Sequence, residues 1–460
     1  MRIERDGIGE IQLPDEALYG IQSARARENF RLGYKPTHMR LIYAMVQVKK
    51  AAALTYGKLM AGGEKERVYQ AVVTACDRIL SGEADGMFIV DALQGGAGTS
   101  AHMNVNEVVA NLALRVLGRQ AGEYRVVHPL DDVNRGQSTN DVYPTALRVA
   151  AIESLRELSG GCARLQQAFQ EKENAFDHIR KLGRTEWMDA VPVTLGAEFG
   201  SYAQALARDR WRLYKVEERL RQVNLGGAAV GLGSGAERKY RFGVVETLRE
   251  LTGIGLAAAE YPMDITQNND VFVEVSGLLK ALAVNLMKIS NDLRLMNSGP
   301  HGGLGEIRLA AVQAGSTVMP GKVNPVIPEM TMQAAMKVMA NDFAVTTAAS
   351  HGEFELNAFL PLIADALLES LALLTAAVEL FREKCVETLQ PDPARCLALL
   401  EGSYAEAAGF VPVLGYDAVS RIIDARRGRP REIMEALRQA ALENQTSPEN
   451  QTSFEAGRNG

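Results

Sequence analysis

The chain has 460 residues, of which 47% are hydrophobic and 23% are charged, and its formal net charge is -6. A chain of this length and composition can bury a large core, and we expect two or three domains or one extended architecture. No basic stripe or block of like charge stands out, which argues against nucleic acid as the main partner and favours a small molecule.

The compartment can be inferred from the N-terminus, the hydropathy and the cysteines. The first residues, MRIERDGIGE, are charged and do not resemble a signal peptide. No uncharged apolar stretch reaches the roughly 18 residues that a bilayer requires, so we expect no membrane span and a cytoplasmic location. The four cysteines lie far apart without the paired spacing of a zinc site, which favours buried free thiols over metal ligands or disulfides. They are Cys76, Cys162, Cys385 and Cys396.

In chain order, strand signals are few and lie near the N-terminus and around 124–129 (YRVVHP). Several later segments carry apolar residues at helical spacing, and 271–296 does so most clearly. Its seam, sustained over three heptads, consists of Val275, Leu278, Leu282, Leu286, Ile289, Leu293 and Met296. No proline occurs between Pro262 and Pro300, so this span allows an unbroken helix of more than thirty residues.

The other periodic segments extend this pattern to most of the chain. They are 202–220, 330–349 and 359–389. Together they predict a bundle of long helices, whose apolar faces also make oligomerisation plausible. After about Pro391 the pattern changes to short helical pieces, and the last residues (443–460, with a short NQTS repeat) are polar and are expected to fray.

Four polar or glycine-rich stretches interrupt the helical pattern, at 95–107, 128–145, 183–196 and 314–330. Serine and threonine hydroxyls and exposed backbone N–H groups donate hydrogen bonds to carboxylates, and a lysine adds charge. One such stretch alone is more often a helix cap or a turn. Four of them in one chain favour a carboxylate site, although spacing alone does not bring them together in space.

The motifs themselves resemble those of a known family. GSTVMPGKVNP, at 315–325, is similar to Gly-Ser-Ser-x-Met-Pro-x-Lys-x-Asn-Pro, the signature of the aspartase/fumarase superfamily. The stretches QGGAGTSAHMNVNEVVAN, HPLDDVNRGQSTNDVYPTALRVA and GRTEWMDAVPVTLGAEF look like other blocks of that superfamily, in the same order. The resemblance extends over nearly the whole chain and is strongest to aspartate ammonia-lyases.

The resemblance implies a mainly helical, three-domain aspartase/fumarase fold. The domains would be an N-terminal one (1–138), a central bundle of long helices with the catalytic loop 314–330 (139–388), and a small helical C-terminal one (389–460). It also implies a homotetramer in which loops of three subunits form each active site. The partner would be a small carboxylate substrate, with no nucleic acid, no membrane, no metal and no cofactor.

The chemistry of the superfamily is an elimination beside a carboxylate. A base removes a proton from the neighbouring carbon, an aci-carboxylate forms, and the leaving group departs. By matching the signature, the base would be Ser316, acting as an oxyanion on a mobile loop. Because serine is a weak base, backbone N–H groups and a nearby cation must favour its ionised form. Gly315 and Gly321 suit a loop that brings backbone N–H groups close.

The same matching assigns the other roles. The carboxylate that becomes the aci-carboxylate would be held by Thr99, Ser138, Thr139 and Thr317. The second carboxylate would be held by Lys322, Asn324 and Thr185, and Asn140 would contact the leaving group. Glu329 occupies the position that in many relatives pairs with an active-site histidine.

Several positions depart from the superfamily pattern. Glu186 stands where many relatives have that histidine and some aspartases have glutamine. A carboxylate there would repel a substrate carboxylate unless it is protonated or faces a cation, and beside Glu329 one of the two should have a raised pKa. The remaining departures from the usual residues are Ala228 and Leu232 for threonines, His301 for arginine, and Gly305 and His102 for asparagines.

The resemblance therefore implies a carbon-nitrogen lyase, with L-aspartate giving fumarate and ammonia as the first candidate. The departures leave a second candidate, a cationic amine such as an ergothioneine-type betaine that releases trimethylamine. Glu186 would then face the ammonium, with Trp187 supplying an aromatic face. Fumarate hydration and a non-catalytic scaffold are less favoured, the latter because Ser316, Lys322 and Asn324 are all present.

Overall fold

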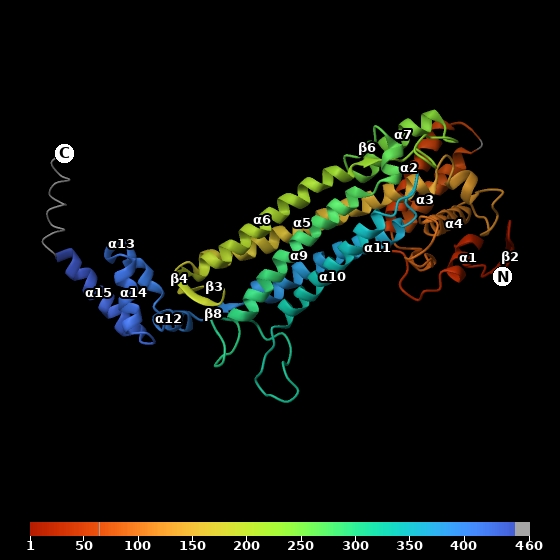
Figure 1. The fold of residues 1–460 in the computed structure, drawn as a ribbon. Coiled ribbons are helices and arrows are strands. Elements are labelled where there is room, and N and C mark those ends of the chain that lie inside the picture. The colour runs from red at the N-terminus through yellow and green to blue at the C-terminus, as the bar shows by residue number, and fades with distance from the viewer. Residues whose placement is uncertain (64, 447–460) are drawn as a thin grey trace, which may run out of the picture. The chain divides into compact units, whose positions relative to one another are not determined.

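The computed structural model describes residues 1–63 and 65–446 and is mainly helical, as the sequence predicts (Figure 1). The chain forms two compact units. The first unit comprises 1–161, 209–284 and 333–376, and the second comprises 162–208, 285–332 and the chain from 377 onward. The predicted division into 1–138, 139–388 and 389–460 remains a prediction. Most of the polar tail, 447–460, lies outside the described residues.

The first unit begins with an antiparallel hairpin and a group of helices. These elements are β1 (Arg2–Asp6), β2 (Gly9–Leu13), α1 (Ile21–Asn29), α2 (Met39–Leu59), α3 (Glu66–Leu80), η1 (Asp85–Met87), α4 (Thr99–Val116), η2 (Pro129–Val133) and α7 (Arg238–Thr252). Helix α2 packs against α3 and α7, and α3 packs against α4 (Figure 1). At the centre, the ring of Tyr56 stacks between those of Tyr69 and Tyr240, with centroid distances of 5.7 and 4.7 Å.

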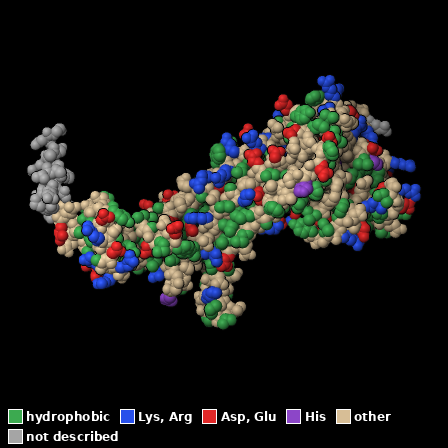
Figure 2. All heavy atoms as spheres, viewed as in Figure 1, with side chains coloured by type: hydrophobic (Ala, Val, Ile, Leu, Met, Phe, Trp, Pro, Cys, Tyr) green, Lys and Arg blue, Asp and Glu red, His purple; other side chains and the backbone are tan. Residues whose placement is uncertain are grey.

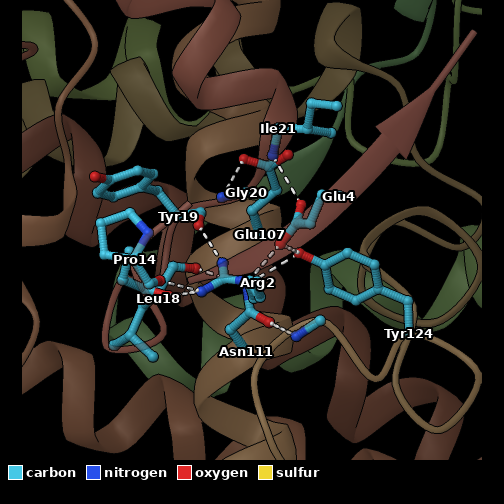
Figure 3. A network of polar contacts seen from close by, with 12 residues as sticks. Arg2, Glu4, Pro14, Leu18, Tyr19, Gly20, Ile21, Glu107, Asn111 and Tyr124 are labelled. Carbon is cyan, nitrogen blue, oxygen red and sulfur yellow. Dashed lines mark hydrogen bonds and ion pairs between the residues drawn. The ribbon is translucent and has the colours of Figure 1, made fainter. Parts of the chain in front are cut away.

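Two buried carboxylates, one from α4 and one from β1, hold the start of α1 (Figure 3). Glu107 in α4 accepts hydrogen bonds from the backbone N–H groups of Gly20, Gln22 and Ser23, which open α1. Glu4 in β1 accepts from the N–H of Ile21 at 2.8 Å. The first N–H groups of a helix have no partner within the helix, so these carboxylates satisfy donors that would otherwise be buried and unpaired.

The long helices supply the rest of the first unit and part of the second. They are α5 (Thr139–Phe176), α6 (Leu195–Leu220), α9 (Asp270–Met296), α10 (Val326–Ala349) and α11 (Leu360–Phe381). Within the first unit, Ser276 of α9 donates to Asp342 of α10 at 2.8 Å. Asn341 of α10 donates to Ser370 of α11 at 3.1 Å. Buried polar contacts thus link neighbouring helices at fixed positions along their length.

Helix α9 confirms the long helix predicted at 271–296, and every residue of the predicted seam is buried except Leu278, which is half-buried. Helix α9 has 27 residues and does not reach the more than thirty that the absence of proline would allow. A short helix, α8 (Pro262–Gln267), ends at Asn268, whose backbone is extended. The side chain of Asn268 donates to Asp264 at 2.6 Å, a local bond of the kind that lets asparagine compete with the helix.

In the second unit, aromatic rings pack between helices. The ring centroid of Phe169 in α5 lies 6.0 Å from that of Phe199 in α6 and 6.3 Å from that of Phe381, the last residue of α11. Gly200 of α6 faces Glu173 of α5, where an added Cβ would come within 2.4 Å of the carboxylate, so glycine permits this approach. The remaining elements of the unit are β3 (Arg180–Thr185), β4 (Met188–Thr194), β7 (Ile307–Arg308), η3 (Arg382–Val386), β8 (Gln390–Pro391), α12 (Pro393–Glu401), η4 (Ala405–Phe410), α13 (Val411–Leu414), α14 (Tyr416–Ala425) and α15 (Pro430–Thr446).

Two strand predictions have different outcomes. The hairpin of β1 and β2 confirms the strand signal near the N-terminus. The signal at 124–129 is wrong, because this segment forms turns, with the N–H of Val126 bonded to the carbonyl of Glu123. Conversely, part of the stretch 183–196, interpreted as a loop, belongs to the antiparallel hairpin β3–β4. The first unit also holds a short parallel pair, β5 (Gln222–Val223) and β6 (Ala257–Ala258).

The thiol prediction is confirmed, since all four cysteines are buried thiols outside any disulfide. One helical stretch, Leu360–Val386, has the length and hydropathy to cross a membrane, but 67% of its apolar window is buried inside the structure. Its Asp365 and Glu369 form ion pairs with Lys35, at 3.0 and 2.9 Å. These contacts are those of a core helix.

Candidate active site

The signature residues lie on a loop between β7 and α10, in the second unit. The Oγ of Ser316 accepts hydrogen bonds from the backbone N–H groups of Val318, at 3.2 Å, and Met319, at 2.9 Å. The side chain of Asn324 donates to the carbonyl of Gly315 at 2.7 Å and closes the loop. Two N–H donors on one hydroxyl oxygen favour its ionised form, as a serine base requires.

Glycine is required at the point where the loop closes. A Cβ on Gly315 would lie 1.9 Å from the carbonyl oxygen of Lys322, so any other residue would force the two strands of the loop apart. Gly321 has a φ of 80°, in the left-handed region that glycine adopts without strain. The loop geometry therefore depends on both glycines of the motif.

The loop extends away from the neighbouring helices (Figure 1). Figure 2 shows hydrophobic surface at its end, and Val318 and Met319 are 83% and 52% exposed. The ammonium of Lys322 makes no ion pair with any residue of the described chain. The cation of the signature is thus available to an incoming anion.

A cleft of about 850 Å³ lies beside this loop and is lined by Lys322, Asn324 and Glu329. Arg294, Arg308 and Arg395 also line it, so the cleft is rich in cations. Glu329, in the first turn of α10, lies 3.6 Å from the guanidinium of Arg294. Such a cleft favours an anionic ligand.

The β3–β4 hairpin presents two of the predicted residues. Thr185 pairs with Met188, and the two-residue turn between them consists of Glu186 and Trp187. Both turn residues have a positive φ, 53° for Glu186 and 68° for Trp187, as a type I′ turn requires. Residues other than glycine rarely adopt a positive φ. Strain of this kind occurs most often at functional sites. All four side chains are exposed.

Buried ion pairs hold this hairpin in place. Lys181 of β3 is 1% exposed and lies 2.7 Å from Glu198 and 2.8 Å from Glu306. Arg184 also pairs with Glu306, at 2.9 Å. Burial raises the pKa of Glu198, while Lys181 opposes that shift. A cleft of about 420 Å³ is lined by Glu186 and by members of these ion pairs, Lys181, Arg184 and Glu198.

In the first unit, three predicted residues lie where α5 begins: Ser138, Thr139 and Asn140. Asp141, completely buried, accepts hydrogen bonds from the backbone N–H groups of Ser138, Gly226 and Ala228. Burial raises the pKa of Asp141 to about 6 despite these donors. The Asp141 carboxylate thus connects the start of α5 to the segment around Ala228, the position where the superfamily pattern has threonine.

The hydroxyl of Thr139 contacts a residue on α4. Its Oγ lies 2.8 Å from Nδ1 of His102, and Nε2 of His102 lies 2.6 Å from the ammonium of Lys49 on α2. Thr99, the first residue of α4, donates its hydroxyl to the carbonyl of Gly96 at 2.8 Å. Sequence reasoning missed Lys49, although a lysine within the apolar pattern of α2 was a possible signal.

The predicted residues therefore form two groups, one in each unit. The first unit holds Thr99, Ser138, Thr139 and Asn140, and the second holds Thr185, Glu186, Ser316, Thr317, Lys322, Asn324 and Glu329. Their individual roles remain predictions. In the described part of the chain, no three histidine, cysteine or acidic side chains gather as a metal site would require.

Comparison with known proteins identifies relatives over nearly the whole chain. A family model described as lyase matches residues 9–340. Aspartate ammonia-lyase of Pseudomonas fluorescens is 43% identical over 96% of this chain and 92% of its own length. The aspartate ammonia-lyases of Helicobacter pylori J99 (43%) and Bacillus subtilis 168 (42%) each match 92% of this chain and, respectively, 90% and 88% of their own length.

Solved structures agree with these matches. The fumarate lyase:delta crystallin from Brucella melitensis, bound to cobalt, has a TM-score of 0.90 and 43% identity, over 96% of this chain and 99% of that one. The class II fumarase from Schistosoma mansoni has a TM-score of 0.89 and 31% identity, over 96% and 95%. The chain therefore belongs to the aspartase/fumarase superfamily of lyases.

Proposed function

We propose that the protein is an aspartate ammonia-lyase, which converts L-aspartate into fumarate and ammonia. The support for the substrate is the 42–43% identity to aspartate ammonia-lyases over more than nine-tenths of the chain. The support for the chemistry is the turn at Ser316, where two backbone N–H groups point at the hydroxyl oxygen. The observation that carries the proposal is this turn, within a stretch that matches the signature except for Thr317 in place of the second serine.

In the proposed reaction, the ionised hydroxyl of Ser316 takes a proton from the carbon beside one substrate carboxylate. The electron pair of the broken C–H bond moves into that carboxylate and forms the aci-carboxylate. When this pair returns to form the carbon-carbon double bond, the C–N bond breaks and ammonia leaves. Fixed donors lower the barrier because they stabilise the extra negative charge as it develops.

Substrate binding requires donors for two carboxylates. In the proposal Lys322 and Asn324 hold one of them, in keeping with the cationic cleft that they line. Hydroxyls at the start of α5, Ser138 and Thr139, hold the other. We further propose a homotetramer in which the two groups that form one site come from different subunits.

The test is an assay of the purified protein with L-aspartate, which follows ammonia and the ultraviolet absorbance of fumarate. We expect both products in equal amounts, and we expect Ser316→Ala to abolish them while the circular dichroism spectrum is unchanged. Thr317→Ser, which keeps a hydroxyl beside Ser316, serves as the matched variant and retains most of the activity. A protein inert towards aspartate, or a fully active Ser316→Ala variant, contradicts the proposal.

One observation favours a second candidate, the cationic amine substrate. Glu186 and Trp187 form an exposed turn, so a carboxylate and an indole stand next to each other, and Trp187 is 64% exposed. This pair suits a quaternary ammonium group. The same assay with ergothioneine distinguishes the two candidates, since release of trimethylamine with no activity on aspartate would replace the first candidate by the second.

A further inference from the structure

The inference concerns a buried lysine that the proposed chemistry does not use. Lys49 lies on α2 and its side chain is completely buried. Its ammonium nitrogen lies 2.6 Å from Nε2 of His102, 2.8 Å from Oδ1 of Asn134 and 2.9 Å from Oε1 of Gln137. An ammonium group has three N–H donors and no acceptor, so these contacts satisfy it completely.

This arrangement fixes the tautomer of His102. Because charged Lys49 can only donate, Nε2 of His102 must carry the lone pair, and the ring proton must sit on Nδ1. Nδ1 lies 2.8 Å from Oγ of Thr139, so the ring donates to the threonine hydroxyl. Burial and the adjacent ammonium lower the pKa of His102 well below its ordinary value, which keeps the ring neutral.

The proton of the Thr139 hydroxyl must then point away from Nδ1 of His102. Its oxygen accepts from His102, so its O–H must donate to some other acceptor. Thr139 is the first residue of α5, in the stretch proposed to hold a substrate carboxylate. We propose that Lys49 and His102 are positioning residues, which aim the hydroxyl proton of Thr139 at the substrate carboxylate; this inference rests on the proposed function.

The other proton state of the same network lacks this donor. A neutral Lys49 would donate to Asn134 and Gln137 and accept from Nε2–H of His102. Nδ1 would then accept a hydrogen bond from the hydroxyl of Thr139, and the substrate carboxylate would lose a donor. Carboxylate binding should therefore be strong at low pH, where Lys49 is charged, and weaken as the pH rises through the pKa of Lys49.

The surroundings of Lys49 make this titration accessible. The titratable groups that face it are Asp141 on α5, Cys76 on α3 and His102 on α4. Burial lowers the pKa of Lys49 well below that of an exposed lysine, while Asp141 and Cys76 act in the opposite direction. The two tautomers of His102 thus correspond to two charge states of one buried amine.

Two substitutions of His102 distinguish a positioning role of its ring from a purely structural one. In His102→Asn, the side-chain amide reaches the place of Nδ1 and can still donate to Thr139, whatever the charge of Lys49. In His102→Gln, the amide reaches the place of Nε2, so Lys49 keeps a partner but Thr139 loses its donor. His178→Gln, at an exposed histidine of the second unit, is the matched control.

The experiment measures kcat and KM for L-aspartate, and the inhibition constant of succinate, which has no amino group, from about pH 5 to about pH 10 in the full-length enzyme, because burial can lower a lysine pKa to about 5 or 6. We expect KM and the succinate constant of His102→Gln to exceed those of His102→Asn by about 10- to 100-fold, as for a lost hydrogen bond to a charged group. Their kcat values should differ by less than about threefold. In the wild type the succinate constant should rise with pH, and in His102→Asn it should not.

Other outcomes overturn the inference in distinguishable ways. An active wild type with a succinate constant independent of pH, or two variants with the same KM, would overturn the role of His102 and leave the proposed function standing. A wild type that does not act on aspartate overturns both. If neither variant folds, as judged by thermal denaturation, the wild-type dependence of the succinate constant on pH still decides.

Discussion

At the scale of single residues, the catalytic proposal depends on atoms of the backbone more than on side chains. The hydroxyl of Ser316 is held by N–H groups that any residue at 318 or 319 other than proline would supply. Val318 is 83% exposed, so its side chain contributes little to packing. The sequence motif identifies the serine but says nothing about which groups support its charge.

Val318→Pro tests these donors because it removes one of the two N–H groups that face the Ser316 hydroxyl. We expect kcat to fall about 100-fold, the usual effect of removing one donor from a developing oxyanion. Val318→Ala, which keeps the N–H, should retain nearly all activity in the same aspartate assay. Equal activities of the two variants would show that this N–H does not support the base.

A motif names candidate positions, whereas burial depends on the surroundings of a residue. Ser316 and Lys322 follow from the signature, and their roles remain predictions. Lys49 was missed because a lysine in a helical pattern is usually a solvated residue, and only the packing of α2 against α3 and α7 shows that this one is buried. Its three acceptors come from distant parts of the chain, which no local pattern reveals.

At the scale of secondary structure elements, periodicity predicted the long helices well and their boundaries less well. Helix α9 follows from its apolar seam, but the interruption at Asn268 does not, because a single asparagine lowers helix propensity far less than a proline would. The hairpin β3–β4 was missed because its turn, Glu186–Trp187, lacks the Asn-Gly signal of a type I′ turn.

The attachment of α1 gives a prediction at this scale. Glu107→Ala leaves three backbone N–H groups of the first turn without an acceptor, in a buried place. We expect a loss of about 2 to 4 kcal/mol in the free energy of unfolding, seen as a lower melting temperature. Glu83→Ala, which breaks an exposed ion pair with Arg78, is the control and should cost less than about 1 kcal/mol. Equal shifts for the two variants would contradict the assigned role of Glu107.

At the scale of the whole molecule, the predicted site residues divide between the two compact units. The first unit carries three of the four donors predicted for the aci-carboxylate, and the second unit carries the fourth, Thr317, together with the donors predicted for the other carboxylate. The sequence places the residues in order along the chain but does not determine which of them meet in one site. The proposed homotetramer would bring the two groups together from different subunits.

Mixing variants tests the shared site. Ser316→Ala damages only the group in the second unit, and Thr139→Val damages only the group in the first. When the two inactive proteins are unfolded together and refolded, mixed tetramers should contain some sites with both groups intact. We expect activity of up to about a quarter of the wild type, a statistical estimate for random assembly of closed oligomers. Complete inactivity of the refolded mixture, with wild-type refolding intact, would contradict shared sites.

The three acceptors around the Lys49 ammonium also bear on how this enzyme can change in evolution. Each acceptor satisfies one proton of a buried cation, so loss of any one leaves an uncompensated donor away from water. Substitutions that remove the acceptor at Asn134 or Gln137 should therefore destabilise the fold unless Lys49 changes as well. A lineage that altered substrate preference through Thr139 would have to alter this inner network with it.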